Sequence, residues 1–230
     1  MKKSEFVNSH KVGGWCKMPT GKAKMPALKF GRLDVPKAID NRCYCTAIED
    51  QGSKPWCAAY TAAAFAENVL WRRDGKIRQV ETEPIYSWAK AHDGDPNGDG
   101  TTLNAVLDAL LAKKIFQDPC KVKTIWSVLD KRDDVKAAVH RFGCVLAGFN
   151  ITTEWYDLAN GRKKSVKGST GNSLGGHAVL ICGYDEGGVW IENSWGESWG
   201  EKGFGYIEWS AFDKQFVYGA VLTNCLNDFR

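Results

Sequence analysis

Four polar residues spread along the chain are of the types used in covalent catalysis: Gln51, Cys57, His177 and Asn193. Cys57 opens an alanine-rich stretch that favours a helix, directly after Trp56. A helix N-terminus and a neighbouring imidazolium both favour an anion, so together they lower the pKa of a thiol and populate the reactive thiolate. The position of Cys57 therefore predicts a nucleophile, provided that the rest of the chain supplies a base.

His177 is the histidine that suits this role. It follows Gly175 and Gly176, which let a backbone or a ligand approach closely, and it opens the apolar run HAVLICGYD. A turn at 186–188 leads into VWIENSW, so we expect a hairpin that brings Asn193 near His177. An asparagine in that place can accept the ring N–H and hold the imidazole in one orientation. The remaining histidines are interpreted as solvated side chains: His10, His92 and His140.

Gln51 lies shortly before Cys57. Its side-chain amide and the Cys57 backbone N–H can both point at an oxygen bonded to the carbon under attack, which is the arrangement of an oxyanion hole. Each of the four residues alone has an ordinary structural role, such as a buried thiol or a turn asparagine. Their combination is what predicts nucleophilic catalysis.

The first half of the chain is predicted to be helical and the second half to be mainly strands. The predicted helices are 57–74, 83–91, one capped by Thr102, and one from Asp133 or Asp134 to about Phe142. After Gly143, short apolar runs separated by glycine and polar turns predict strands. Segregated helices and strands indicate an α+β fold with two lobes.

Charge divides the chain further. Residues 1–33 hold eight basic residues and one acidic residue, so a basic arm precedes a slightly acidic body, and the net charge of +4 is too small to predict a nucleic-acid partner. We expect a basic arm at 1–34, a helical lobe at 35–118 that carries the nucleophile, and a mainly β lobe at 119–230 that carries the histidine and the asparagine. The arm is either a short pro-segment that inhibits the protein by lying over a cleft or a loosely attached tail.

No apolar stretch of the sequence resembles a secretory signal or is long enough to span a bilayer. We therefore expect no membrane partner, and either a cytoplasmic location or export by a route that uses no signal peptide. A chain of 230 residues suits one compact unit, and we expect a monomer.

The chain has eight cysteines, but it is long enough to build a core without disulfides. If Cys57 is a catalytic thiol, at least one of the other seven is unpaired or bonded to another molecule. Cys144 and Cys182 lie inside apolar runs and are predicted to be buried thiols. Cys43 and Cys45 have no second ligand pair at the usual zinc spacing, so no metal and no cofactor are predicted.

The order of Cys57, His177 and Asn193, with Gln51 ahead of the cysteine, resembles the papain (C1) family of cysteine peptidases, and its bacterial members in particular. The residues that carry the resemblance are Asp50-Gln51-Gly52, Cys57, Gly176-His177-Ala178-Val179, Asn193-Ser194-Trp195-Gly196, Glu197-Ser198-Trp199-Gly200 and Gly203-Phe204-Gly205-Tyr206. The resemblance implies a helical N-terminal lobe, an antiparallel β-barrel-like C-terminal lobe and an active site in the cleft between them. It also implies endopeptidase activity on a peptide or protein substrate through an acyl-enzyme.

The resemblance assigns a role to each catalytic residue. Cys57 is the nucleophile, His177 its base and then its acid, Asn193 orients His177, and Gln51 donates to the oxyanion. Trp195 shields the contact between Asn193 and His177 from water.

The resemblance also assigns substrate contacts. Trp199 lines the leaving-group side of the cleft, and Gly100 hydrogen-bonds the substrate backbone. Gly148 and Gly175, with Gly176 beside them, lie along the pocket for the second residue before the scissile bond.

The chain departs from the family pattern around the nucleophile. The family usually has Cys-Gly-Ser-Cys-Trp, whereas this chain has Lys54-Pro55-Trp56-Cys57-Ala58, so the common disulfide of the helical lobe is in doubt. We expect the proline and the tryptophan to fix this loop by ring stiffness and packing. Two alternatives remain open: an inactive relative that binds a peptide, and a transpeptidase or deamidase effector with the same triad.

Residues 93–99, DGDPNGD, open like a calcium-binding loop. The twelfth position of that loop is Asn104, where a bidentate glutamate belongs. The alternative is a polar turn on the rim of the cleft, in which Asp93, Asp95 and Asp99 favour basic substrates.

Overall fold

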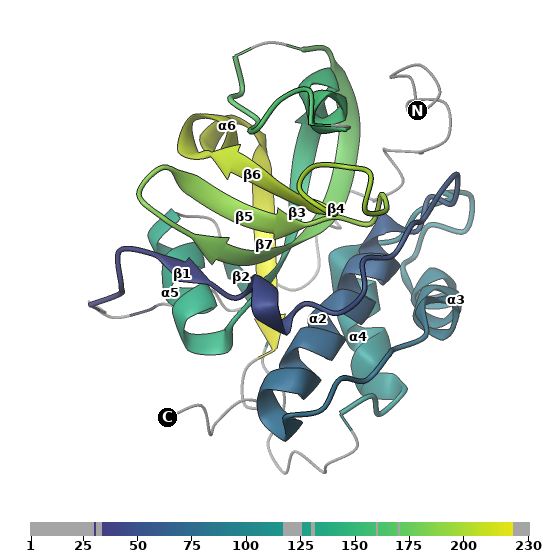
Figure 1. Ribbon diagram of the computed structural model, residues 1–230. Coiled ribbons are helices and arrows are strands. Elements are labelled where there is room, and N and C mark those ends of the chain that lie inside the picture. Colours follow the sequence, from purple (N-terminus) through teal and green to yellow (C-terminus); the bar gives the residue numbers. More distant parts are fainter. Residues whose placement is uncertain are drawn as a thin grey trace.

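The computed structural model describes residues 30, 34–116, 126–129, 132–159, 161–169 and 171–222, and its fold is drawn in Figure 1. The described helices are η1 (Arg42–Tyr44), α2 (Cys57–Asp74), α3 (Thr82–His92), α4 (Leu103–Ala112), α5 (Arg132–Phe142), η2 (Thr153–Leu158) and α6 (Trp209–Gln215). The described strands are β1 (Ile39–Asp40), β2 (Trp126–Leu129), β3 (Val145–Thr152), β4 (Ser173–Tyr184), β5 (Gly188–Glu192), β6 (Phe204–Glu208) and β7 (Phe216–Leu222). The predicted α+β class is confirmed, while most of the predicted arm and three cysteines (Cys16, Cys120 and Cys225) lie outside the described residues.

Helix α2 is the central helix of the fold, and it spans the predicted residues. It ends because Gly75 adopts the left-handed conformation (φ 65°) and donates to the Trp71 carbonyl at 2.8 Å. Its alanines are buried and let neighbouring elements approach closely: Ala58, Ala59, Ala62, Ala63 and Ala66. The helix packs against α3, α4 and β4, so it joins the helical side of the molecule to the sheet (Figure 1).

Helices α3 and α4 complete the helical side. Thr102 caps α4 as predicted, because its hydroxyl accepts the backbone N–H of Ala105 at 3.1 Å. The apolar stripe of α4 is buried except for Leu111, which is half-buried: Leu103, Val106, Leu107 and Leu110. The loop between α3 and α4 carries the calcium-like residues 93–99.

The sheet is antiparallel, with the strand order β2-β7-β3-β4-β5-β6, and β1 pairs with β4. The strands at its two ends, β2 and β6, do not pair with each other, so the sheet is open. The antiparallel β lobe predicted by the resemblance is present, as an open sheet and not a closed barrel. The hairpin of β4 and β5 is present as predicted, with Leu180 opposite Glu192 and a turn from Asp185 to Gly188.

Several elements differ from the sequence prediction. Strands β1 and β2 and helix α6 were not predicted, because β1 has two residues, β2 has four and α6 has seven. Helix α5 begins at Arg132, so Asp133 and Asp134 lie in its first turn, where carboxylates favour the helix dipole, and neither is the cap. Within the described ranges, no helix is both long enough and apolar enough to cross a membrane.

Candidate active site

Cys57 is the first residue of α2, and its side chain is only 1% exposed. Burial raises the pKa of the Cys57 thiol to about 11, although backbone N–H groups of Ala178, Ala58 and Cys57 itself hydrogen-bond the sulfur and lower that pKa. The sequence predicted a net lowering of this pKa; that prediction is wrong for this arrangement because burial outweighs the helix terminus. The bond from Ala178 shows that the strand carrying His177 reaches the thiol.

His177 lies on β4, fully buried, and its Nε2 is 2.8 Å from Oδ1 of Asn193. The same Oδ1 accepts the backbone N–H of Ser194 at 2.9 Å. Because a backbone N–H can only donate, this atom is the amide oxygen, and Nε2 must carry the ring proton. The hydrogen bond therefore fixes the tautomer of His177 and leaves Nδ1 as its basic nitrogen.

Aromatic rings enclose this pair. The Trp195 ring lies over His177, with centroids 4.6 Å apart, and the Trp155 ring meets His177 edge-on at 6.3 Å. Trp195 and Trp199 are both fully buried, and the Trp199 indole N–H donates to the Trp155 carbonyl at 2.8 Å. These rings bury the hydrogen bond between His177 and Asn193, and the shielding role assigned to Trp195 stays a prediction.

Gln51 is also buried and lies beside the same asparagine. Its Oε1 accepts the Ser194 hydroxyl at 2.6 Å, and its backbone N–H donates to the Ser194 carbonyl at 2.9 Å. Its side-chain amide donates to the carbonyl of Lys54 at 3.0 Å, within the loop that leads to Cys57. Ser194 therefore links the loop before the nucleophile to the residue that orients the histidine.

The predicted substrate-contact residues lie on two sides. Gly148 on β3 is paired with Ala178 on β4, and Gly175 and Gly176 lie on β4 before His177, Gly175 with φ 104°. These glycines keep side chains away from the sheet beside the nucleophile. Asp99 and Gly100 lie on the other side, in the loop after α3. The roles assigned to these residues and to Trp199 stay predictions.

The atypical residues before Cys57 form a packed cluster of rings. The Trp56 ring stacks on Tyr86 of α3, with centroids 4.2 Å apart, which confirms the expected packing of Trp56. The ammonium of Lys54 lies 4.6 Å from the centroid of the Trp56 ring. A cation over an aromatic face is attractive, so Lys54 covers the outer face of this stack.

The thiol and metal predictions concern the other cysteines. Cys43, Cys45, Cys57, Cys144 and Cys182 are free thiols, and Cys144 and Cys182 are buried as predicted. In the part of the chain that the structure describes, no group of three or more His, Cys, Asp or Glu residues is arranged to hold a metal ion.

Sequence reasoning missed several residues around the triad. Ser194 and Trp155 were not assigned, although Ser194 stands beside Asn193 in the motif. An acidic cluster was also missed, in which Glu67 and Glu192 are buried and Glu49 is half-buried; it lines a cavity of about 10 Å³ that Asn193 and Ser194 border. No signal in the sequence marks these glutamates, because each lies in a different element.

Comparisons with known proteins agree with this geometry. The family model described as papain family cysteine protease matches residues 111–216, which include His177 and Asn193 but not Cys57. Cathepsin K from Gallus gallus is 28% identical, over 74% of this chain and 58% of its own. The chain spans less than two thirds of the length of the first curated relatives it matches.

Solved structures share the fold. Xylellain, a cysteine protease from Xylella fastidiosa, matches with a TM-score of 0.70 at 19% identity, over 92% of this chain and 96% of that chain. Procathepsin B S9 from Trypanosoma congolense matches with a TM-score of 0.69 at 17% identity, over 97% and 89% of the two chains. The fold is therefore papain-like. More narrowly, the stretch at 111–216 and the curated relatives show that the chain is similar to the papain (C1) family of cysteine peptidases.

Proposed function

We propose that the protein is a cysteine endopeptidase that hydrolyses peptide bonds through an acyl-enzyme on Cys57. One observation carries this proposal: the Cys57 sulfur accepts the backbone N–H of Ala178, the residue directly after His177, while His177 is held by Asn193. These two contacts support a nucleophile on α2 that faces the strand carrying the base and its orienting group.

The proposed reaction moves one proton through His177 in each half. Nδ1 of His177 takes the thiol proton as the sulfur attacks the peptide carbonyl carbon, and the Gln51 amide and the Cys57 backbone N–H donate to the oxyanion. His177 then gives this proton to the leaving amine, which departs as the C–N bond breaks and a thioester forms. Water attacks the thioester with His177 again as the base, and the returning proton restores the thiol.

The raised pKa of Cys57 fits a mechanism in which the thiol proton passes to His177 as the sulfur attacks the substrate. A pKa of about 11 arises from burial opposed by backbone N–H groups, with no charged side chain among its causes. An imidazolium beside the sulfur would lower that pKa, because an adjacent positive charge favours the thiolate. The thiolate therefore forms together with the imidazolium of His177.

The test compares the wild type with Cys57→Ala on fluorogenic dipeptide amides and with an epoxide inhibitor that labels thiolates. We expect turnover and a single label on Cys57 in the wild type, and loss of both in the variant. Cys43→Ser is the matched control, because Cys43 is an exposed thiol and its loss should change neither result.

The outcomes separate the proposed peptidase from its alternatives. A folded wild type with no turnover and no label on Cys57 would contradict the peptidase and favour an inactive relative that binds a peptide. Labelling with product transferred to an added amine, rather than to water, would favour a transpeptidase, because both reactions share the acyl-enzyme.

We also propose that residues 1–34 inhibit the protein. The basic composition of this arm and the similarity to a proform, procathepsin B S9, support the proposal. Removal of residues 1–33 should raise kcat/KM for dipeptide amides, and the separate arm peptide added to the truncated protein should lower it again. Equal kinetics in the full-length and truncated proteins would leave the arm as a tail.

A further inference from the structure

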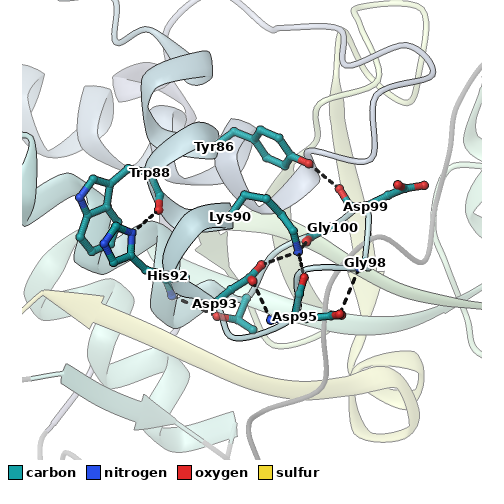
Figure 2. A network of polar contacts seen from close by, with 11 residues as sticks. Tyr86, Trp88, Lys90, His92, Asp93, Asp95, Gly98, Asp99 and Gly100 are labelled. Atoms are coloured by element: carbon teal, nitrogen blue, oxygen red, sulfur yellow. Dashed lines mark hydrogen bonds and ion pairs between the residues drawn. The ribbon is translucent and has the colours of Figure 1, made fainter.

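The loop at 93–100 surrounds a positively charged group, the side-chain ammonium of Lys90. Lys90, near the end of α3, directs its ammonium into the loop that resembles a calcium site (Figure 2). Its Nζ lies 2.9 Å from Oδ2 of Asp93 and 3.0 Å from the carbonyl oxygen of Gly100, and it donates to the carbonyl of Asp95 as well. The ammonium thus binds one carboxylate and two carbonyls, which are the oxygen types that a calcium loop offers to its ion.

The pairing of Lys90 with Asp93 is enclosed. The Asp93 side chain is fully buried, and that of Lys90 is 19% exposed. A buried carboxylate is costly unless it is paired, and loss of its partner is strongly destabilising. The geometry of the loop therefore depends on the charge of Lys90.

The loop also holds itself together through its aspartates. Asp93 accepts the backbone N–H of Asp95 at 3.0 Å, and Asp95 accepts that of Gly98 at 3.0 Å (Figure 2). A Cβ at Gly98 would lie 2.3 Å from the Asp95 carboxylate, so a larger residue there would displace that side chain from its hydrogen bond. The acidic residues that suggested calcium are thus used for turn hydrogen bonds and for one ion pair.

The anchored loop leads back to the nucleophile. Tyr86, one turn before Lys90 on α3, donates its hydroxyl to the Asp99 carbonyl at 2.7 Å. The same tyrosine ring stacks on Trp56, whose next residue is Cys57. Two side chains of α3, Tyr86 and Lys90, therefore hydrogen-bond the backbone carbonyls of Asp99 and Gly100. The stack of Tyr86 on Trp56 connects this loop to the start of α2.

We propose that Lys90 is a positioning residue for substrate, an internal cation that holds Asp99 and Gly100 at the rim of the cleft. This inference rests on the proposed peptidase function, and it deepens that function by naming the residue that positions the rim of the cleft. Lys90 touches no reacting atom, so it acts on the binding of the peptide backbone rather than on the chemical step.

The test uses Lys90→Met, which keeps the methylene chain and removes the charge. We expect KM for dipeptide amides to rise by roughly tenfold or more, as for loss of a charged hydrogen-bond partner, while kcat stays within about threefold. Alkylation of Cys57 by iodoacetamide, which needs no rim, should keep its wild-type rate. Hydrogen exchange at the amides of Asp95 and Gly98 should become faster.

A second variant isolates the charge. Asp93→Asn added to Lys90→Met removes the unpaired carboxylate while the remaining amide oxygen can still accept the Asp95 N–H, so KM and exchange should return part of the way to wild type. Lys113→Met, at an exposed lysine after α4, is the matched control and should change nothing.

The outcomes distinguish this inference from the function on which it rests. Unchanged KM and exchange in Lys90→Met would overturn it, and so would equal losses of kcat and Cys57 alkylation, which indicate general damage to the fold. If the wild type itself turns over no peptide, the peptidase and the substrate role of Lys90 both fail, and hydrogen exchange alone then decides whether Lys90 anchors the loop.

Discussion

His177→Ala is expected to lower kcat/KM for peptide amides by roughly 10³-fold or more in a protein that remains folded. The reason is geometric. Asn193 fixes Nε2 as the protonated nitrogen of His177, and the neighbouring Ala178 N–H already contacts the Cys57 sulfur. Removal of the imidazole takes away the base that accepts the thiol proton and the acid that protonates the leaving amine.

The pH dependence of Cys57 alkylation checks this explanation directly. His177→Ala leaves no base to accept the thiol proton, so the alkylation rate near neutral pH should fall and should rise only as the pH approaches the pKa of about 11. Asn193→Ala should give a smaller loss of kcat, because it frees the orientation of His177 but keeps the imidazole. The exposed His140 on α5 supplies the control variant, His140→Ala. Activity that persists in His177→Ala would mean that another base serves Cys57.

The sequence was sufficient to predict the contact between His177 and Asn193 because both residues belong to one hairpin. His177 lies within one strand of a hairpin and Asn193 directly follows the other, so a turn of known position brings them together. The helix that begins at Cys57 was predictable for a similar reason, since alanines, a terminal Arg72-Arg73 pair and Gly75 define its two ends. Both predictions needed only neighbours along one element.

The remainder required contacts between distant elements. The resemblance predicted a barrel-like lobe, but whether its sheet closes depends on whether β2 and β6 pair, which is set by the twist of all the strands between them. The loop at 93–99 shows the same limit, because its sequence suggested calcium and only the direction of the Lys90 side chain reveals the resident ammonium. The pKa of Cys57 was mispredicted because burial is a property of the assembled fold.

The acidic cluster of Glu49, Glu67 and Glu192 gives the second large effect: the free energy of unfolding should fall as pH rises from about 5 to about 8, by about 3 kcal/mol from Glu192 alone. Burial raises the pKa of Glu192 from 4.5 to about 7, with Glu67 and Glu49 raising it further and a hydrogen bond to Cys45 opposing them. The contribution of Glu192 to stability is fully present below its unfolded pKa, where both states are protonated. It is lost as pH rises through the folded pKa, because the unfolded chain ionises first.

Glu67 and Glu49 lie near Glu192, so the loss of stability is expected where α2 meets the sheet. Glu67 on α2 accepts the Val80 N–H at 2.7 Å and the Thr46 hydroxyl, and Glu49 accepts the Thr82 hydroxyl at 3.2 Å. Burial also raises the pKa of both of these carboxyls. Oε2 of Glu192 has no hydrogen-bond partner among the described residues, so an ionised Glu192 would meet the nearby glutamates with only the hydrogen bond to Cys45 to offset the repulsion.

Glu192→Gln tests this directly because glutamine keeps the shape and stays neutral at every pH. Denaturant unfolding should give nearly equal stability for variant and wild type near pH 5, and a more stable variant near pH 8, by about 3 kcal/mol. Glu197→Gln, at an exposed glutamate a few residues along the chain, should follow the wild type at both pH values. The explanation fails if the wild type and Glu192→Gln lose stability in parallel, since ionisation of Glu192 would then contribute nothing. Because Glu192 directly precedes Asn193, the same ionisation should loosen the residue that orients His177, and peptidase activity should decline over the pH range in which stability falls.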